Sequence, residues 1–120
     1  MEPGNTRTVY VVQVDYNKDV SDAKRFGSLR AVFGNARKPY DTPALIGKAR
    51  RVLSNWNPGD YLLMIGDPVL CAVCMALVAE RYEDINVLSW DRNTFQYMPQ
   101  YWNFGQMELP FDDNDFDTVD

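Results

Sequence analysis

Short apolar runs alternate with helix-forming stretches along most of the chain, and this alternation limits the folds that the chain can adopt. Residues 8–16 are rich in β-branched and aromatic residues and nearly continuous in apolar character, as in a strand covered on both faces. A strand–helix–strand alternation predicts a mostly parallel sheet. Further strands are expected at 29–33, 61–65 and 85–90, and helices at 21–26, 42–56 and 68–82.

Capping residues and proline indicate where the helices begin. Ser21 is expected to be the N-cap of the first helix, and Thr42 caps the second. Asp67 is a suitable N-cap for the third, with Pro68 at its first position. The segment 68–82 is apolar on nearly every side, which indicates a helix buried in the core or against another chain, including a second copy of this one.

The end of the chain predicts a hairpin and a tail. Residues 91–93 are expected to form a turn and residues 94–98 an antiparallel fifth strand, followed by Tyr101, Trp102 and Phe104 in a short strand or coil. Right-handed crossovers favour the strand order 2-1-3-4, with the fifth strand at the edge. The predicted fold class is α/β: one three-layer domain over residues 1–107, with a mostly parallel sheet of about five strands, an antiparallel edge hairpin and helices on both faces. Residues 108–120 are expected to be an acidic, flexible C-terminal tail.

Several classes of chemistry lack the residues that they need. The chain contains no histidine, which excludes Ser-His and Cys-His catalysis and histidine-ligated metals. Cys71 and Cys74 match C-x-x-C, but they lie within an apolar helix and are interpreted as buried core residues. No dinucleotide-binding or P-loop motif occurs. We therefore predict no catalytic residue, no metal ligand and no cofactor.

The predicted sheet places one candidate site at the carboxyl ends of its strands. The strand order changes direction between the first and third strands, and open α/β sheets bind ligands outside such a switch point. Clustered carboxylates there could hold magnesium. The alternative is that these aspartates are ordinary turn and capping residues. The residues of this candidate crevice are Asp15, Gly66, Asp67 and Asp91.

Charge is distributed unevenly along the chain, whose formal net charge is −5. Residues 24–51 contain eight bases and one acid, a net charge of +7. Such a density of bases is suited to phosphate and nucleic acid, although a solvated face that keeps a small domain soluble has the same composition. The candidate phosphate or nucleic-acid surface consists of Arg37, Lys38, Lys48, Arg50 and Arg51.

The tail opposes this basic block with six acids and no base over residues 108–120. It resembles the acidic, phenylalanine-containing C-termini of single-stranded-DNA-binding proteins, which recruit partner proteins. Occupation of the basic block by the tail and a purely solvating terminus are the alternatives. The candidate partner-binding residues are Phe111, Asp112, Asp113, Asp115, Phe116 and Asp117.

Four segments together resemble a family of small conserved proteins of tailed bacteriophages. They are YVVQVDY (10–16), SDAKRFGSLRAVF (21–33), DYLLMIGDPVL (60–70) and VLSWDR (87–92). The resemblance implies a viral accessory protein expressed in the cytoplasm of a host bacterium, and it supplies no catalytic residue.

Two functions follow as hypotheses. The first is a non-enzymatic phage accessory protein that binds a host or viral macromolecule, since such a function needs surfaces and no catalytic motif. The second is a nucleotide- or nucleic-acid-binding protein, or an enzyme of nucleotide chemistry, that uses the crevice and the basic block. No run of roughly 18 apolar residues occurs, so no membrane partner is expected.

Overall fold

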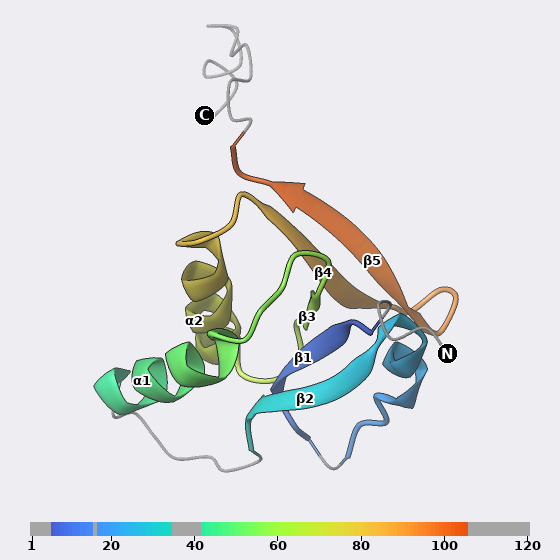
Figure 1. Ribbon diagram of the computed structural model, residues 1–120. Helices are drawn as coiled ribbons and strands as arrows, with labels where there is room; N and C mark the ends of the chain where they lie inside the picture. Colours follow the sequence, from blue (N-terminus) through green and yellow to red (C-terminus); the bar gives the residue numbers. More distant parts are fainter. Residues whose placement is uncertain (1–5, 16, 35–41, 106–120) are drawn as a thin grey trace, which may run out of the picture.

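A five-stranded sheet organises the computed structural model, which describes residues 6–15, 17–34 and 42–105 (Figure 1). Three helical segments connect the first four strands, and a turn connects the last two. In chain order the elements are β1 (Thr8–Gln13), the 3₁₀ helix η2 (Ser21–Phe26), β2 (Ser28–Phe33), α1 (Thr42–Leu53), β3 (Tyr61–Leu63), α2 (Pro68–Ala79), β4 (Asp84–Asp91) and β5 (Gln96–Asn103).

The strands lie in the order β2-β1-β3-β4-β5. The first four are parallel to one another, and β5 is antiparallel to β4. This confirms the predicted strand order and the antiparallel edge. The order arises because the chain forms β2 on one side of β1 and then crosses to the other side to form β3 and β4.

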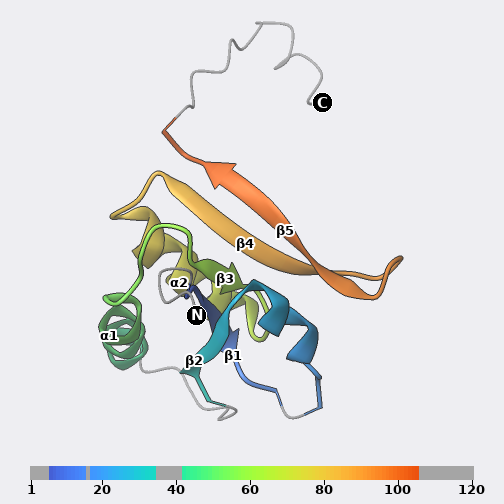
Figure 2. The same ribbon diagram turned by 45° about the vertical axis from the view of Figure 1, so that its right-hand side comes forward.

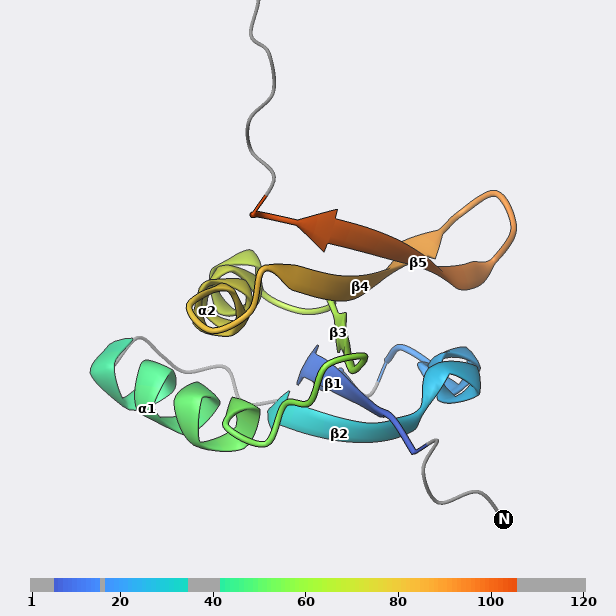
Figure 3. The ribbon, with the colours of Figure 1, turned by 45° about the horizontal axis from the view of Figure 1, so that its top comes forward.

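The change of direction at β1 decides which face each helix covers. Right-handed crossovers that run in opposite directions place their helices on opposite faces of a sheet. Accordingly, α1 and α2 lie on one side of the sheet and η2 lies on the other (Figure 3). The second face has less cover, because η2 has six residues whereas α1 and α2 have 12 each.

Two apolar clusters form the core, one on each face. Tyr10 and Val12 point toward the α-helices, and the ring of Tyr10 stacks on Trp56 with centroids 5.4 Å apart. Val9 and Val11 point to the other face and pack with Ala23 of η2. These four central side chains of β1 are at most 3% exposed, which confirms that this strand is covered on both faces.

The helix starts were predicted with mixed success. The carboxylate of Asp67 accepts a hydrogen bond from the N–H of Val69 at 2.8 Å, and Pro68 begins α2, as predicted. Ser21 was wrongly expected to be an N-cap: it lies inside η2, and its own N–H donates to Oδ1 of Asp19 at 2.9 Å. The aspartate two residues earlier therefore supplies the local acceptor that Ser21 was expected to be.

The fifth strand is longer than predicted and includes Tyr101 and Trp102. It runs from Gln96 to Asn103, and the β4–β5 hairpin forms one whole side of the molecule (Figure 2). Pro99 favoured an early end, since proline cannot donate to a neighbouring strand. On an edge strand, however, every second N–H points outward, so a proline at such a position interrupts no hydrogen bond of the sheet.

Candidate functional site

Each of the three aspartates predicted at the crevice accepts hydrogen bonds from nearby donors. Oδ1 of Asp15 accepts from the N–H of Asn17 at 2.9 Å, and Asp67 caps α2 as described above. Asp91 accepts from the N–H of Asn93 at 3.0 Å and from the hydroxyl of Thr94 at 2.9 Å. These are the contacts of turn and capping residues.

Gln13 occupies the space where β1 and β3 end. Its Oε1 accepts from the N–H of Asp67 at 2.8 Å, and its Nε2 donates to the carbonyl of Gly34 at 3.4 Å. Gly66 has a φ of +110°, and a Cβ at this position would lie 2.4 Å from Cβ of Gln13. The glycine therefore lets the backbone approach the Gln13 side chain, which fills the place where a ligand was expected.

Magnesium does not fit this group of residues well. Within residues 6–15, 17–34 and 42–105, no cluster of three or more Asp, Glu, Cys or His side chains could hold a metal ion. Because each predicted carboxylate already accepts a hydrogen bond, a cation there would have to displace contacts that define the turns.

The two cysteines lie within α2 as predicted, Cys71 half-buried and Cys74 buried. Burial raises the pKa of both thiols, that of Cys74 to about 12. Both remain free. A protonated, buried thiol is a poor nucleophile, so this geometry favours packing over redox chemistry.

The fold divides the basic block between the two faces of the sheet. Lys24 and Arg25 belong to η2, whereas Lys48, Arg50 and Arg51 lie on the exposed side of α1. Arg50 pairs with Glu80 of α2 at 3.0 Å. Arg37 and Lys38 lie outside the described residues, as do the tail residues Phe111, Asp112, Asp113, Asp115, Phe116 and Asp117.

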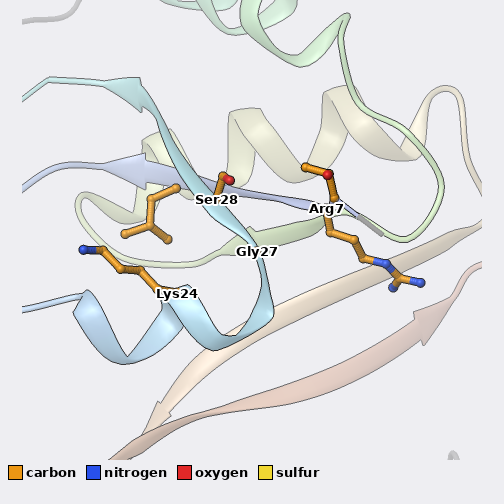
Figure 4. Close-up of a pocket in the computed structure, with 6 residues that line it drawn as sticks. Arg7, Lys24, Gly27 and Ser28 are labelled. Atoms are coloured by element: carbon orange, nitrogen blue, oxygen red, sulfur yellow. The ribbon is translucent and has the colours of Figure 1, made fainter. Parts of the chain in front are cut away.

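A shallow hollow of about 540 Å³ lies where β1 and β2 begin. Figure 4 shows the side chains of Arg7 and Lys24 at its wall pointing in different directions. The guanidinium of Arg7 donates to the carbonyl of Gly59 at 3.2 Å. A site for an anion would need these two cations to converge, and they do not. The lining residues are Thr6, Arg7, Lys24, Gly27, Ser28 and Leu29.

Large apolar side chains are exposed along β5 and directly after it. We call Met98, Tyr101, Trp102 and Phe104 the β5 surface; 40%, 64%, 37% and 40% of their respective areas are exposed. With about 150–250 Å² for each aromatic side chain, their exposed area is on the order of 400 Å². Exposed large apolar side chains gathered on one strand of a soluble protein are a feature of interaction sites.

The register of β5 against β4 assigns these side chains to two faces. Trp102 pairs with Ile85, which belongs to the helix-side core, so Met98, Trp102 and Phe104 share that face by alternation. Tyr101 alternates with them and lies on the η2 side. Phe104 continues the pairing, because its N–H donates to the carbonyl of Glu83 at 2.8 Å.

Gln100 holds the helix-side row in place. Its Nε2 donates to the hydroxyl of Ser89 at 3.1 Å, and its Oε1 accepts from the indole N–H of Trp102 at 3.1 Å. The ring of Trp102 meets Phe104 edge to face, with centroids 5.9 Å apart. The polar group of the tryptophan is thus satisfied within the molecule, and its ring is left as an apolar contact surface.

The outer edge of β5 is closed at Tyr97 by η2. The N–H of Tyr97 donates to Oδ2 of Asp22 at 2.9 Å, and its carbonyl accepts from Arg25 at 2.7 Å. The next outward-facing position, two residues along, is Pro99, which has no N–H. Over this stretch the edge cannot accept another strand in the usual way.

Three features were missed in reading the sequence. Residues 93–107 contain five aromatic residues and no charged one, a pattern that could have indicated the β5 surface. Gln13 gave no such signal. Asp60 is only 3% exposed, and its carboxylate accepts from the N–H groups of Thr8 at 3.0 Å and Asn57 at 2.8 Å, which joins the start of β1 to the turn before β3.

The fold and its exposed strand define a small α/β domain with an aromatic edge hairpin and with its crevice filled by its own residues. The chain belongs to the family of phage Pam3 gp32-like proteins, whose model matches residues 7–107. That span includes the whole β5 surface. Comparison with curated proteins and with solved structures gave no match. Across residues 6–15, 17–34 and 42–105, no helix has the length and apolar character needed to cross a membrane.

Proposed function

We propose that this phage protein is a non-enzymatic binding protein that docks a protein partner through the β5 surface within the infected bacterial cell. The observation that carries the proposal is the set of four large, exposed apolar side chains on, and directly after, a strand without charged residues. The centres of protein–protein interfaces are enriched in aromatic residues and methionine and depleted in charge. The β5 surface has this composition.

Protein is favoured over nucleic acid by the charges around the β5 surface. Bases of single-stranded nucleic acid stack on aromatic rings, but the phosphates need nearby cations. Here Asp84, the first residue of β4, and Glu83, directly before it, lie opposite the end of β5. The carboxylate of Asp84 also accepts from the side-chain amide of Asn103, beside Tyr101 and Trp102. Phosphates on this surface would face carboxylates.

The second candidate function is nucleic-acid binding by α1, where Lys48 and Arg51 are exposed. This candidate has weaker support than β5, because Arg50 is paired with Glu80 and the bases on η2 face the other way. A nucleotide site in the crevice has the weakest support, given the position of Gln13.

The test is capture of proteins from a lysate of infected host cells by three forms of the full chain. The double variant Met98→Thr/Tyr101→Thr should lose the captured partner by roughly tenfold or more, since aromatic anchors dominate interface energetics. Threonine suits a strand, so the sheet should be preserved. The control Lys48→Glu/Arg51→Glu changes exposed side chains of α1 and should capture as the wild type does.

The reverse pattern would overturn the proposal. If capture is unaffected by the β5 double variant, is lost on charge reversal in α1 and is abolished by nuclease, the protein binds nucleic acid through α1 instead.

A further inference from the structure

The proposed function leaves open what kind of protein segment fits the β5 surface, and the geometry limits the choice. Strand addition is disfavoured, because Asp22 and Arg25 occupy the outward-facing groups of Tyr97 and because Pro99 has no N–H to offer. A partner that covers residues 97–99 must therefore bind through side chains. The face available to it on the helix side is the row Met98, Trp102 and Phe104.

A partner that binds this row makes apolar contacts with it and almost no hydrogen bonds. The indole N–H of Trp102 already donates to Gln100, and Gln100 donates in turn to Ser89. From Met98 to Phe104 the row extends roughly 20 Å at about 3.4 Å per residue. An α-helix of roughly 14 residues has that length at 1.5 Å per residue. Amphipathic helices bind such apolar faces through side chains that recur every three or four residues.

The charge beside the row determines which residues a partner helix should carry next to its apolar side chains. The carbonyl of Glu83 accepts from the N–H of Phe104, and its carboxylate lies against Gly105, directly after the row, where a Cβ on the glycine would be 2.3 Å from Oε1. Asp84 is the first residue of β4, and the register with β5 puts it on the η2-side face with Tyr101. Within the described residues, no base lies on β5 to balance Glu83. A partner with Lys or Arg beside its apolar ridge would complement this carboxylate.

Two nearer occupants fit less well. The tail of this chain carries six acids over residues 108–120, which Glu83 would repel. In a second copy, the apolar side of the amphipathic helix α1 is already packed in its own core, and α2 has no basic residue at its border. Neither supplies an apolar ridge with a basic border.

We infer that the row Met98, Trp102 and Phe104, with Glu83 beside it, is a docking face for a basic amphipathic helix of a partner protein. This inference rests on the proposed function and specifies the partner's chemistry. It predicts that the two faces of β5 are unequal, with the helix-side face binding and the η2-side face contributing little.

The probe is a labelled synthetic helical peptide that has leucine along one face and lysine at its borders. Its binding to the full chain is measured by fluorescence anisotropy, beside a peptide in which glutamate replaces lysine. Met98→Thr should weaken the lysine peptide roughly tenfold, whereas Tyr101→Thr, on the opposite face, should change its affinity less than about twofold. The glutamate peptide should bind at least tenfold more weakly than the lysine peptide.

A pair of charge variants separates a specific contact from general attraction to an acidic protein. Glu83→Gln and Asp84→Asn change the net charge equally, but Asp84 lies on the η2-side face with Tyr101, whereas Glu83 lies at the end of the row, against Gly105. We expect Glu83→Gln to weaken the lysine peptide about threefold, as for a rim charge, and Asp84→Asn to leave the affinity unchanged. High salt should remove the difference between Glu83→Gln and the wild type.

Equal binding of both peptides, or equal effects of the two charge variants, would overturn the inference. So would a wild-type dimer that Met98→Thr dissociates in sedimentation, because that result would assign the face to a second copy. If lysate capture depends on Met98 and Tyr101 while neither peptide binds, the proposed function stands and this inference fails. If capture does not depend on them, the proposed function fails as well.

Discussion

At the carboxyl ends of the parallel strands the side chains are satisfied by the chain itself, whereas on β5 large apolar side chains face outward. Gln13 closes the crevice with hydrogen bonds to Asp67 and Gly34, and Asp15 accepts from its own turn. On β5, the outward backbone groups of Tyr97 and the indole N–H of Trp102 are engaged, but the rings of Tyr101 and Phe104 remain exposed. The place where this fold class usually binds ligands is filled, and an unsatisfied surface occurs at the sheet edge.

This comparison separates two kinds of exposed feature. Aspartates at strand ends are candidates for ligand binding, but each also accepts a hydrogen bond from a backbone N–H within a turn. That structural role is sufficient to explain its presence. An exposed aromatic side chain has no comparable role in the local hydrogen bonding. Substitutions in the crevice should therefore reduce stability, and substitutions on β5 should reduce binding.

The largest effect is expected at Gly66. Gly66→Val puts a β-branched residue at a φ of +110° and drives its Cβ into Gln13, so we expect a loss of about 3 kcal/mol or more in the free energy of unfolding. Chemical denaturation measures it. Gly47→Ala is the matched control: a Cβ there has nothing within 4 Å, and alanine in α1 should stabilise by about 0.5–1 kcal/mol. A tolerated Gly66→Val would show that Gln13 moves easily and that the crevice can open.

A smaller effect is expected where η2 closes the edge of β5. Asp22→Ala removes the acceptor for the N–H of Tyr97, so the amide of Tyr97 should exchange faster with solvent, as measured by NMR. The hydrogen bond from Tyr97, followed by Arg25, lowers the pKa of Asp22 below 3.8. Its stabilising contribution is thus complete well above pH 3.8 and is lost as the pH falls through the lower, folded pKa.

The control for this closure is Asp19→Ala, which removes a carboxylate whose hydrogen bond is to Ser21 within the same loop. It should leave the exchange of the Tyr97 amide unchanged. Equal effects of the two variants would mean that η2 as a whole, and not the Asp22 contact, protects the edge.

The sequence predicted most of the fold because the relevant signals are local or topological. Asp67-Pro68 begins a helix wherever the chain takes it, and a right-handed crossover decides the strand order once the strands are known. The side chain of Gln13 could not be predicted, since its partners Gly34 and Asp67 meet it only after β2 and β3 have paired with β1. The sequence indicated which strand ends border the crevice, but it did not indicate that the Gln13 side chain fills it.

The β5 surface was missed for a different reason. Tyr101, Trp102 and Phe104 were expected in a short strand or coil, and this expectation did not say which face they would leave exposed. The number of helices indicates that one face of β5 stays exposed. Within the described residues, no helix follows α2 that could cover the helix-side face of β5. Aromatic residues on an uncovered edge strand are the signal that such a count can recover.

A third test compares two changes of Asp67. Asp67→Ala removes the cap of α2 and should cost about 1 kcal/mol, whereas Asp67→Asn should cost close to nothing, because asparagine caps as well as aspartate. If the crevice binds no nucleotide, millimolar nucleotide with magnesium should leave the melting temperature of the wild type unchanged. A shift that disappears in Asp67→Asn would restore the crevice as a binding site and weaken the contrast with β5.

The smallest effect on stability should come from the surface with the largest proposed effect on binding. Met98→Thr replaces a side chain that is 40% exposed with a residue that favours strands, so the lost burial and the gained propensity should nearly offset each other. We expect the free energy of unfolding to change by less than about 0.5 kcal/mol, the usual range for surface substitutions. Chemical denaturation of the same preparation that is used for partner capture checks this. A loss above 2 kcal/mol would mean that Met98 is part of the core, and the weaker capture by Met98→Thr/Tyr101→Thr would then report damage to the fold and not a lost contact.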